Sequence, residues 1–314
     1  MAFSFTWLDY VIMVVLACGA LSLGVYRAFR VRRRVRRSGG RAHPYVFALH
    51  ALVLNHQNLR VVPTLLSLIM SHQAAVSLLG VPSEFHLWGG QWWFAGDLLA
   101  VFTVPLVLER FIVPWIHRQR LISVYEFFGL RFRSMAVRRL AAGLGLASTL
   151  MYMAINLSAC SIALETASGL PMIPGAAVIT VFACVYTLLG GMRVISWSDV
   201  GQFSLVIVGL CVIIISGARS LGGLNAIFGA AQQRLFFADF SVDPRVRLTF
   251  WSSIITIPLY NIVVFGLDQA SVMRYSSTPH LHSARHAITL LVPLRMLILT
   301  LCSTCGVVIF AFFK

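Results

Sequence analysis

The chain has 314 residues, of which 59% are hydrophobic and 11% are charged, whereas a soluble domain carries about 25% charged residues. This composition excludes an ordinary soluble protein and predicts one all-α transmembrane domain, because a lipid bilayer leaves no water to satisfy irregular backbone. The formal net charge is +15, but the arginines cluster between apolar runs, so we attribute them to membrane orientation and expect no nucleic-acid partner.

The first apolar run covers residues 7–25, and we expect it to be an extra N-terminal helix. Eight arginines follow between Arg27 and Arg41, and a cationic flank of this kind stays in the cytoplasm. Residues 26–58 are therefore predicted to be a basic cytoplasmic loop, and the N-terminus to be extracellular.

Seven further apolar runs bring the expected number of transmembrane helices to about eight. We therefore expect the chain to be embedded in a lipid bilayer. Most of the intervening arginines fall on the side assigned to the cytoplasm, in agreement with this orientation. An amphipathic segment at 121–133 is expected at the inner interface. The seven runs cover residues 59–80, 94–115, 139–164, 173–190, 200–218, 250–267 and 288–313.

The second run carries polar residues at mid-depth, including Ser71, His72, Gln73 and Ser77. Small and polar residues weaken a helix, and an unwound stretch frees carbonyl groups for a hard cation and side chains for a solute. Hydrogen bonding between helices explains the same residues equally well, so composition alone leaves both interpretations open.

The run at 250–267 contains Pro258, which removes a backbone donor and is expected to kink the helix beside Tyr260 and Asn261. Two interrupted helices, one early and one late, indicate a transporter site. Arg295 lies a few turns into the last run, and we expect its side chain to snorkel toward the inner surface.

Catalytic signatures are missing from the sequence, since it shows no nucleophile with a base, no phosphate loop and no paired catalytic carboxylates. We therefore expect neither an enzyme nor a cofactor. The CxxC at Cys302 and Cys305 lies within an apolar run, where small residues most often serve helix packing.

Five stretches carry a family resemblance: LDYVIMVVLACGALSLGVYRAF, SHQAAVSLLGVPSEFHLWGGQWWF, SVYEFFGLRF, YTLLGGMRVISWSDVGQ and GLDQASVMRY. Together they resemble the sodium:solute symporter family, in its branch of sodium-coupled monocarboxylate and multivitamin transporters. The resemblance implies an incomplete inverted-repeat (5+5) transporter core behind one extra helix. Residues 59–218 then form the first repeat, 219–249 an outer loop, and 250–314 the start of the second repeat.

The resemblance also implies a function, namely symport of sodium with a small organic anion across the plasma membrane. Monocarboxylates and vitamins such as biotin or pantothenate are the expected solutes, and sodium is the coupling ion. The backbone carbonyls of Met70 and Gln73 are implied as sodium ligands. The solute contacts implied are His72, Gln73, Ser77, Tyr260 and Asn261.

The sequence departs from the family at several positions. Asp199 matches an acidic position of the family, and the alternative role for this residue is to pair with arginines on the inner side. By contrast, Asp268 stands where the family has an asparagine, and Arg295 stands where it has a glutamine-rich stretch. The sequence LNHQNL at residues 54–59 replaces a glycine–arginine signature of the family. His72 stands where the branch has an apolar or aromatic residue. By our count Lys314 ends the seventh core helix, so we expect a fragment or truncated form. The alternative function is a non-transporting partner or dominant-negative subunit of a full-length transporter.

Overall fold

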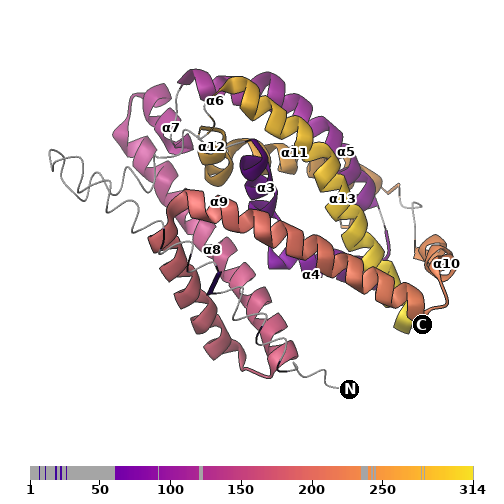
Figure 1. The fold of residues 1–314 in the computed structure, drawn as a ribbon. Coiled ribbons are helices and arrows are strands. Elements are labelled where there is room, and N and C mark those ends of the chain that lie inside the picture. Colours follow the sequence, from indigo (N-terminus) through magenta and orange to yellow (C-terminus); the bar gives the residue numbers. More distant parts are fainter. Residues whose placement is uncertain are drawn as a thin grey trace.

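A computed structural model describes residues 61–313 except 91, 120–122, 235–239, 242, 244, 277 and 279, together with six isolated residues before position 61. The described part is helical (Figure 1), as the composition predicted. The expected N-terminal helix at 7–25 and the basic loop at 26–58 lie outside the stretches that are described.

The helices follow the predicted order along the chain. They are α3 (Val61–His72), α4 (Ala75–Leu87), α5 (Trp92–Val107), a π-helical turn (Leu108–Ile112), α6 (Val113–Gln119), α7 (Val124–Phe132), α8 (Met135–Ser168), α9 (Met172–Ser220), α10 (Leu224–Arg234), α11 (Phe250–Leu267), α12 (Gln269–Ser276) and α13 (Leu281–Phe313).

Five helices in the described part are long and apolar enough to cross a membrane, or six if the bent pair α3–α4 counts as one span. The runs predicted at 173–190 and 200–218 fall on the two arms of α9, which meet at an angle (Figure 1). The apolar stretch of the first arm, Met172–Leu188, is shorter than a full span. The predicted membrane bundle is confirmed, and α11 begins and ends where the run at 250–267 was placed.

Local capping explains where several helices begin and end. Ser134 accepts a hydrogen bond from Val137 N at the start of α8, and Thr249 accepts one from Ser252 N at the start of α11. Such caps satisfy backbone donors that the first turn leaves unpaired. Gly169 ends α8 with a φ of 74°, a left-handed conformation that glycine adopts without steric cost.

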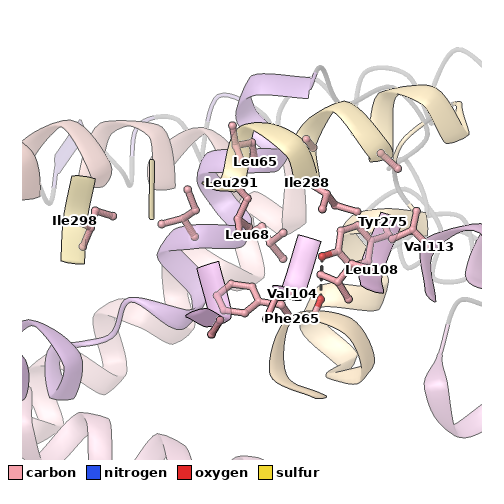
Figure 2. Packing of buried hydrophobic residues seen from close by; sticks show 14 of the residues in the cluster. Leu65, Leu68, Val104, Leu108, Val113, Phe265, Tyr275, Ile288, Leu291 and Ile298 are labelled. Carbon is pink, nitrogen blue, oxygen red and sulfur yellow. Dashed lines mark hydrogen bonds between the residues drawn. The ribbon is translucent and has the colours of Figure 1, made fainter. Parts of the chain in front are cut away.

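The core lies where α3, α5, α12 and α13 meet (Figure 2), and Leu68, Leu108 and Ile288 are fully buried there. Tyr275 is also fully buried, and its hydroxyl donates to Phe265 O at 2.8 Å. Because this phenol has found a backbone acceptor, its burial leaves no unsatisfied polar group.

Helix α8 and the first arm of α9 form a hairpin beside the core (Figure 1). No residue of the apolar window in α8 is buried, and large side chains such as Leu144, Met151 and Leu188 are exposed. A continuous exposed apolar surface of this kind suits contact with lipid or another apolar partner.

One expectation is corrected by the fold. Helix α11 continues unbroken through Pro258 to Leu267, so this proline does not interrupt it; a proline within a membrane helix is tolerated where neighbouring groups satisfy the freed carbonyl. The segment at 219–249, which was expected to be an outer loop, contains the short helix α10.

Candidate functional site

The second predicted span is broken, as its polar residues indicated. Helices α3 and α4 meet at 62°, with Gln73 and Ala74 between them. Gln73 N donates to Ile69 O, while Ser77 N and Leu78 N both donate to Ala74 O. Among the described residues no backbone N–H reaches the carbonyl oxygens of Met70 and Gln73, so these oxygens are available as acceptors or cation ligands.

His72 ends α3 and connects the break to α11 and α12. Its Nε2 lies 2.9 Å from the hydroxyl of the buried Ser271. The Ser271 hydroxyl donates its single proton to Val264 O, at 3.1 Å, so His72 Nε2 must be the donor in the contact with Ser271. The His72 ring also meets Phe265 edge-on, with centroids 4.7 Å apart.

Arg295 of α13 points into the bundle, which overturns the expectation that it snorkels to the surface. Its Nη2 donates to Asp97 Oδ1 at 2.5 Å and to Asn261 Oδ1 at 2.7 Å. Asn261 Nδ2 in turn donates to Ile257 O at 2.8 Å and lies 3.4 Å from Asp97 Oδ1. The Arg295 side chain is 15% exposed and that of Asp97 13%, so this ion pair is largely removed from solvent.

Phe265 joins these two sets of contacts. The Arg295 Cζ atom lies 4.7 Å from the centroid of the Phe265 ring, within the range of a cation–π interaction, and the same ring contacts His72. We refer to the residues contributed by α3, α5, α11, α12 and α13 as the central polar cluster: His72, Asp97, Asn261, Phe265, Ser271 and Arg295.

A second buried group lies on the other side of α3. Ser67 donates to Asp199 Oδ2 at 2.5 Å and accepts from Arg274 Nε at 3.0 Å. Arg274 Nη2 is 4.0 Å from Asp199 Oδ2, and Arg274 is only 6% exposed. Burial lowers the pKa of Arg274, and the Asp199 carboxylate opposes this effect. Asp199 thus lies beside a buried arginine, as the alternative interpretation of this residue expected.

The remaining predicted site residues occupy different surroundings. Ser77 donates to His72 O at 3.4 Å across the break, and the half-buried Gln73 follows His72 directly. Tyr260 is 63% exposed and is not drawn into the cluster with its neighbour Asn261. Asp268 accepts from Ala270 N at 3.0 Å, as the cap of α12. Of the predicted side chains, the structure thus brings only His72 and Asn261 into the central polar cluster.

Asp97 and Arg274 were not predicted as members of any site, and Arg295 was assigned a surface role. The signal for Asp97 was a lone carboxylate in the apolar stretch WWFAGDLLAV. An ionisable residue inside a span is costly unless it is paired. Arg274 gave a weaker signal, because the short helix α12 is not apolar enough to be read as membrane-embedded.

Comparison with known families gives one match that covers most of the chain. The model of the sodium:solute symporter family matches residues 53–313.

Three curated relatives illustrate the similarity. The sodium-dependent multivitamin transporter of Oryctolagus cuniculus is 29% identical over 99% of this chain and 47% of its own length. The sodium/iodide cotransporter of Homo sapiens is 32% identical over 82% of this chain and 40% of its own length. The sodium-coupled monocarboxylate transporter 1 of Mus musculus is 29% identical over 99% of this chain and 49% of its own length. The chain thus spans about half the length of these relatives, which are transporters rather than enzymes.

A solved structure supports the fold independently. The substrate-bound outward-open state of a Na+-coupled sialic acid symporter superposes with a TM-score of 0.83, covering 98% of this chain and 62% of that chain at 19% sequence identity. At this identity the likeness establishes the architecture alone.

Proposed function

Because this chain belongs to the sodium:solute symporter family, we propose that it carries the solute-binding part of a sodium-coupled transporter of small organic anions. The observation that carries the proposal is the break between α3 and α4, with the central polar cluster packed against it. Iodide and monocarboxylates, named for two of the relatives, are anions.

Sodium is proposed to bind at the carbonyl oxygens of Met70 and Gln73. Hard cations prefer oxygen ligands, and interrupted membrane helices supply unpaired carbonyls for this purpose. The contacts across the break support the proposal, because these two oxygens receive no backbone hydrogen bond from the described residues. Further ligands are required to complete the coordination of the ion.

The solute is proposed to bind beside the sodium, at His72, Gln73, Ser77 and Asn261, with Tyr260 as a further predicted contact. His72 and Asn261 belong to one cluster, and Ser77 contacts the backbone of His72. Occupation of the carbonyl site then fixes the end of α3 that also carries His72. Sodium and solute would each favour the same arrangement of the break, which makes their binding reciprocal.

Uptake in cells tests the proposed function. Cells that express the complete gene product are assayed with radiolabelled lactate, nicotinate and biotin, in sodium buffer and with choline in place of sodium. We expect at least one of these carboxylates to accumulate only with sodium. If none does, sodium-coupled anion transport is excluded for this protein; the alternative of a non-transporting partner gains no support from relatives that are all named as transporters.

We further propose a multi-pass protein in the plasma membrane with an extracellular N-terminus, on the strength of the arginine run that follows residue 26. An epitope tag at the N-terminus should be labelled by antibody in intact cells. Labelling that requires permeabilised cells with the protein at the surface would reverse this orientation.

A further inference from the structure

Arg295 has hydrogen-bonding capacity that the described residues do not use. Nη2 donates to both Asp97 Oδ1 and Asn261 Oδ1, whereas Nη1 is buried without a hydrogen-bond partner in the described part of the chain. A guanidinium carries two N–H groups on each terminal nitrogen. The donors of Nη1 are thus held inside the bundle with no acceptor among the described residues.

A buried charged donor without an acceptor lowers stability, so native proteins rarely keep one unless a ligand or water completes it. The side chain is fixed from three directions, by Asp97 of α5, by Asn261 of α11 and by the ring of Phe265 below the guanidinium. A donor that is already fixed loses little further freedom when an acceptor binds, which favours affinity.

The charge of the cluster limits the kind of acceptor. Asp97 offsets the charge of Arg295, so the cluster offers oriented hydrogen bonds rather than a large excess of positive charge. A singly charged carboxylate accepts a charge-assisted hydrogen bond from Nη1, and its single charge meets less repulsion from Asp97 than a doubly charged phosphate would.

We propose that Arg295 binds the carboxylate of the solute through Nη1, and that Asp97 and Asn261 are positioning residues that hold the guanidinium. This proposal rests on the proposed function, which puts the solute beside His72 at the break. Arg295 lies next to that site, because the Phe265 ring contacts both Arg295 and His72. The proposal supplies a cationic group for anion recognition, which the predicted set of solute contacts lacks.

Two substitutions of one ion pair test this role. R295Q and D97N break the same salt bridge, but the side-chain amide that D97N introduces retains an oxygen that can accept from Nη2. If the pair is only structural, both variants lose solute binding together. If Arg295 binds a carboxylate, R295Q weakens binding about tenfold or more, the scale of one lost charge-assisted hydrogen bond, whereas D97N preserves or tightens it, because a repelling charge is gone.

The measurement is thermal stabilisation of the complete purified protein in detergent and sodium, with lactate, nicotinate and biotin as probes and their amides as uncharged controls. We expect a carboxylate, and not its amide, to raise the melting temperature of the wild-type protein. R285Q is the matched control, since Arg285 lies on the same helix, is half-buried and also has a buried nitrogen, Nε, without a partner among the described residues, but it lies ten positions before Arg295. R285Q should respond like the wild-type protein, and R295K should respond partially.

Several results overturn the proposal: no carboxylate stabilises the wild-type protein, R295Q responds like the wild-type protein, or R295Q and D97N lose the response equally. Loss of folding is detected as a lowered melting temperature without ligand. Sodium-dependent uptake separates this test from that of the proposed function. Uptake that persists unchanged in R295Q removes the role of Arg295 alone, whereas selective carboxylate binding without sodium-driven flux removes the transport function alone.

Discussion

Ser67 and Asp199 are 132 positions apart in sequence, yet the Ser67 hydroxyl donates to Asp199 Oδ2 at 2.5 Å in a buried contact. Arg274 completes the group from α12. Three helices are therefore joined by polar contacts at the first half of the broken span.

The R274Q substitution should destabilise the protein strongly, because it leaves the Asp199 carboxylate buried without its counter-charge. Breaking one partner of a buried pair costs about 3–5 kcal/mol. The double variant D199N/R274Q should recover a large part of this loss. Melting temperatures of the purified variants form a double-mutant cycle, and strictly additive effects would show that the two charges do not interact.

The G96A substitution should separate α5 from α11. A Cβ atom at Gly96 would lie 2.6 Å from Ser253 O and 2.9 Å from Ile257 Cδ1, and such overpacking costs about 1–3 kcal/mol. G80A is the control, because a Cβ atom there has no neighbour within 4 Å. Equal melting temperatures for the two variants would contradict the close helix approach.

The S271A substitution should impair solute uptake while leaving the fold intact. It removes the hydroxyl that links His72 to Val264 O, so the imidazole loses its partner at the break. S303A is the matched control, because Ser303 is also buried, but among the described residues its hydroxyl bonds only to Leu299 O of its own helix. The comparison is of the half-saturating solute concentration at equal surface expression, and an equal effect of both variants would argue against a special role for Ser271.

Asp268 should act as a helix cap rather than as a ligand. D268A removes the acceptor for Ala270 N and should cost about 0.5–2 kcal/mol, whereas D268N should be nearly neutral, because asparagine caps as well as aspartate. The melting temperature distinguishes the two variants. A large loss of uptake by D268N, with unchanged stability, would instead assign this carboxylate a direct part in transport.

The helical bundle was predictable because a long apolar run indicates by itself that a segment lies in lipid, where the backbone must be helical. The break at Gln73 and Ala74 was predictable for the same local reason, since polar and small residues interrupt an apolar run there. The helix within the outer segment was missed because α10 is short and is not strongly apolar.

The pairing of charged residues was not predictable from local pattern. Asp97 and Arg295 lie 198 positions apart, and nothing near either residue specifies its partner. Arg295 was expected to snorkel because a single arginine in a span usually reaches for water. The buried carboxylate of Asp97 provides an alternative partner that becomes visible only in three dimensions.

The break has a mechanical consequence for the helix that contains it. Its backbone hydrogen bonds pair Gln73 with Ile69 on one side, and Ser77 and Leu78 with Ala74 on the other; none of those between described residues crosses the peptide bond from Gln73 to Ala74. Helix α4 packs against α13, where Gly306 would meet Pro82 and Phe85 if it carried a Cβ atom. Helix α3 also packs against α13, and side-chain hydrogen bonds join it to α9 and α12. Rotation of one half against the other about this peptide bond therefore breaks no backbone hydrogen bond between the described residues. It is opposed only by side-chain contacts, among them the hydrogen bond from Ser77 Oγ to His72 O.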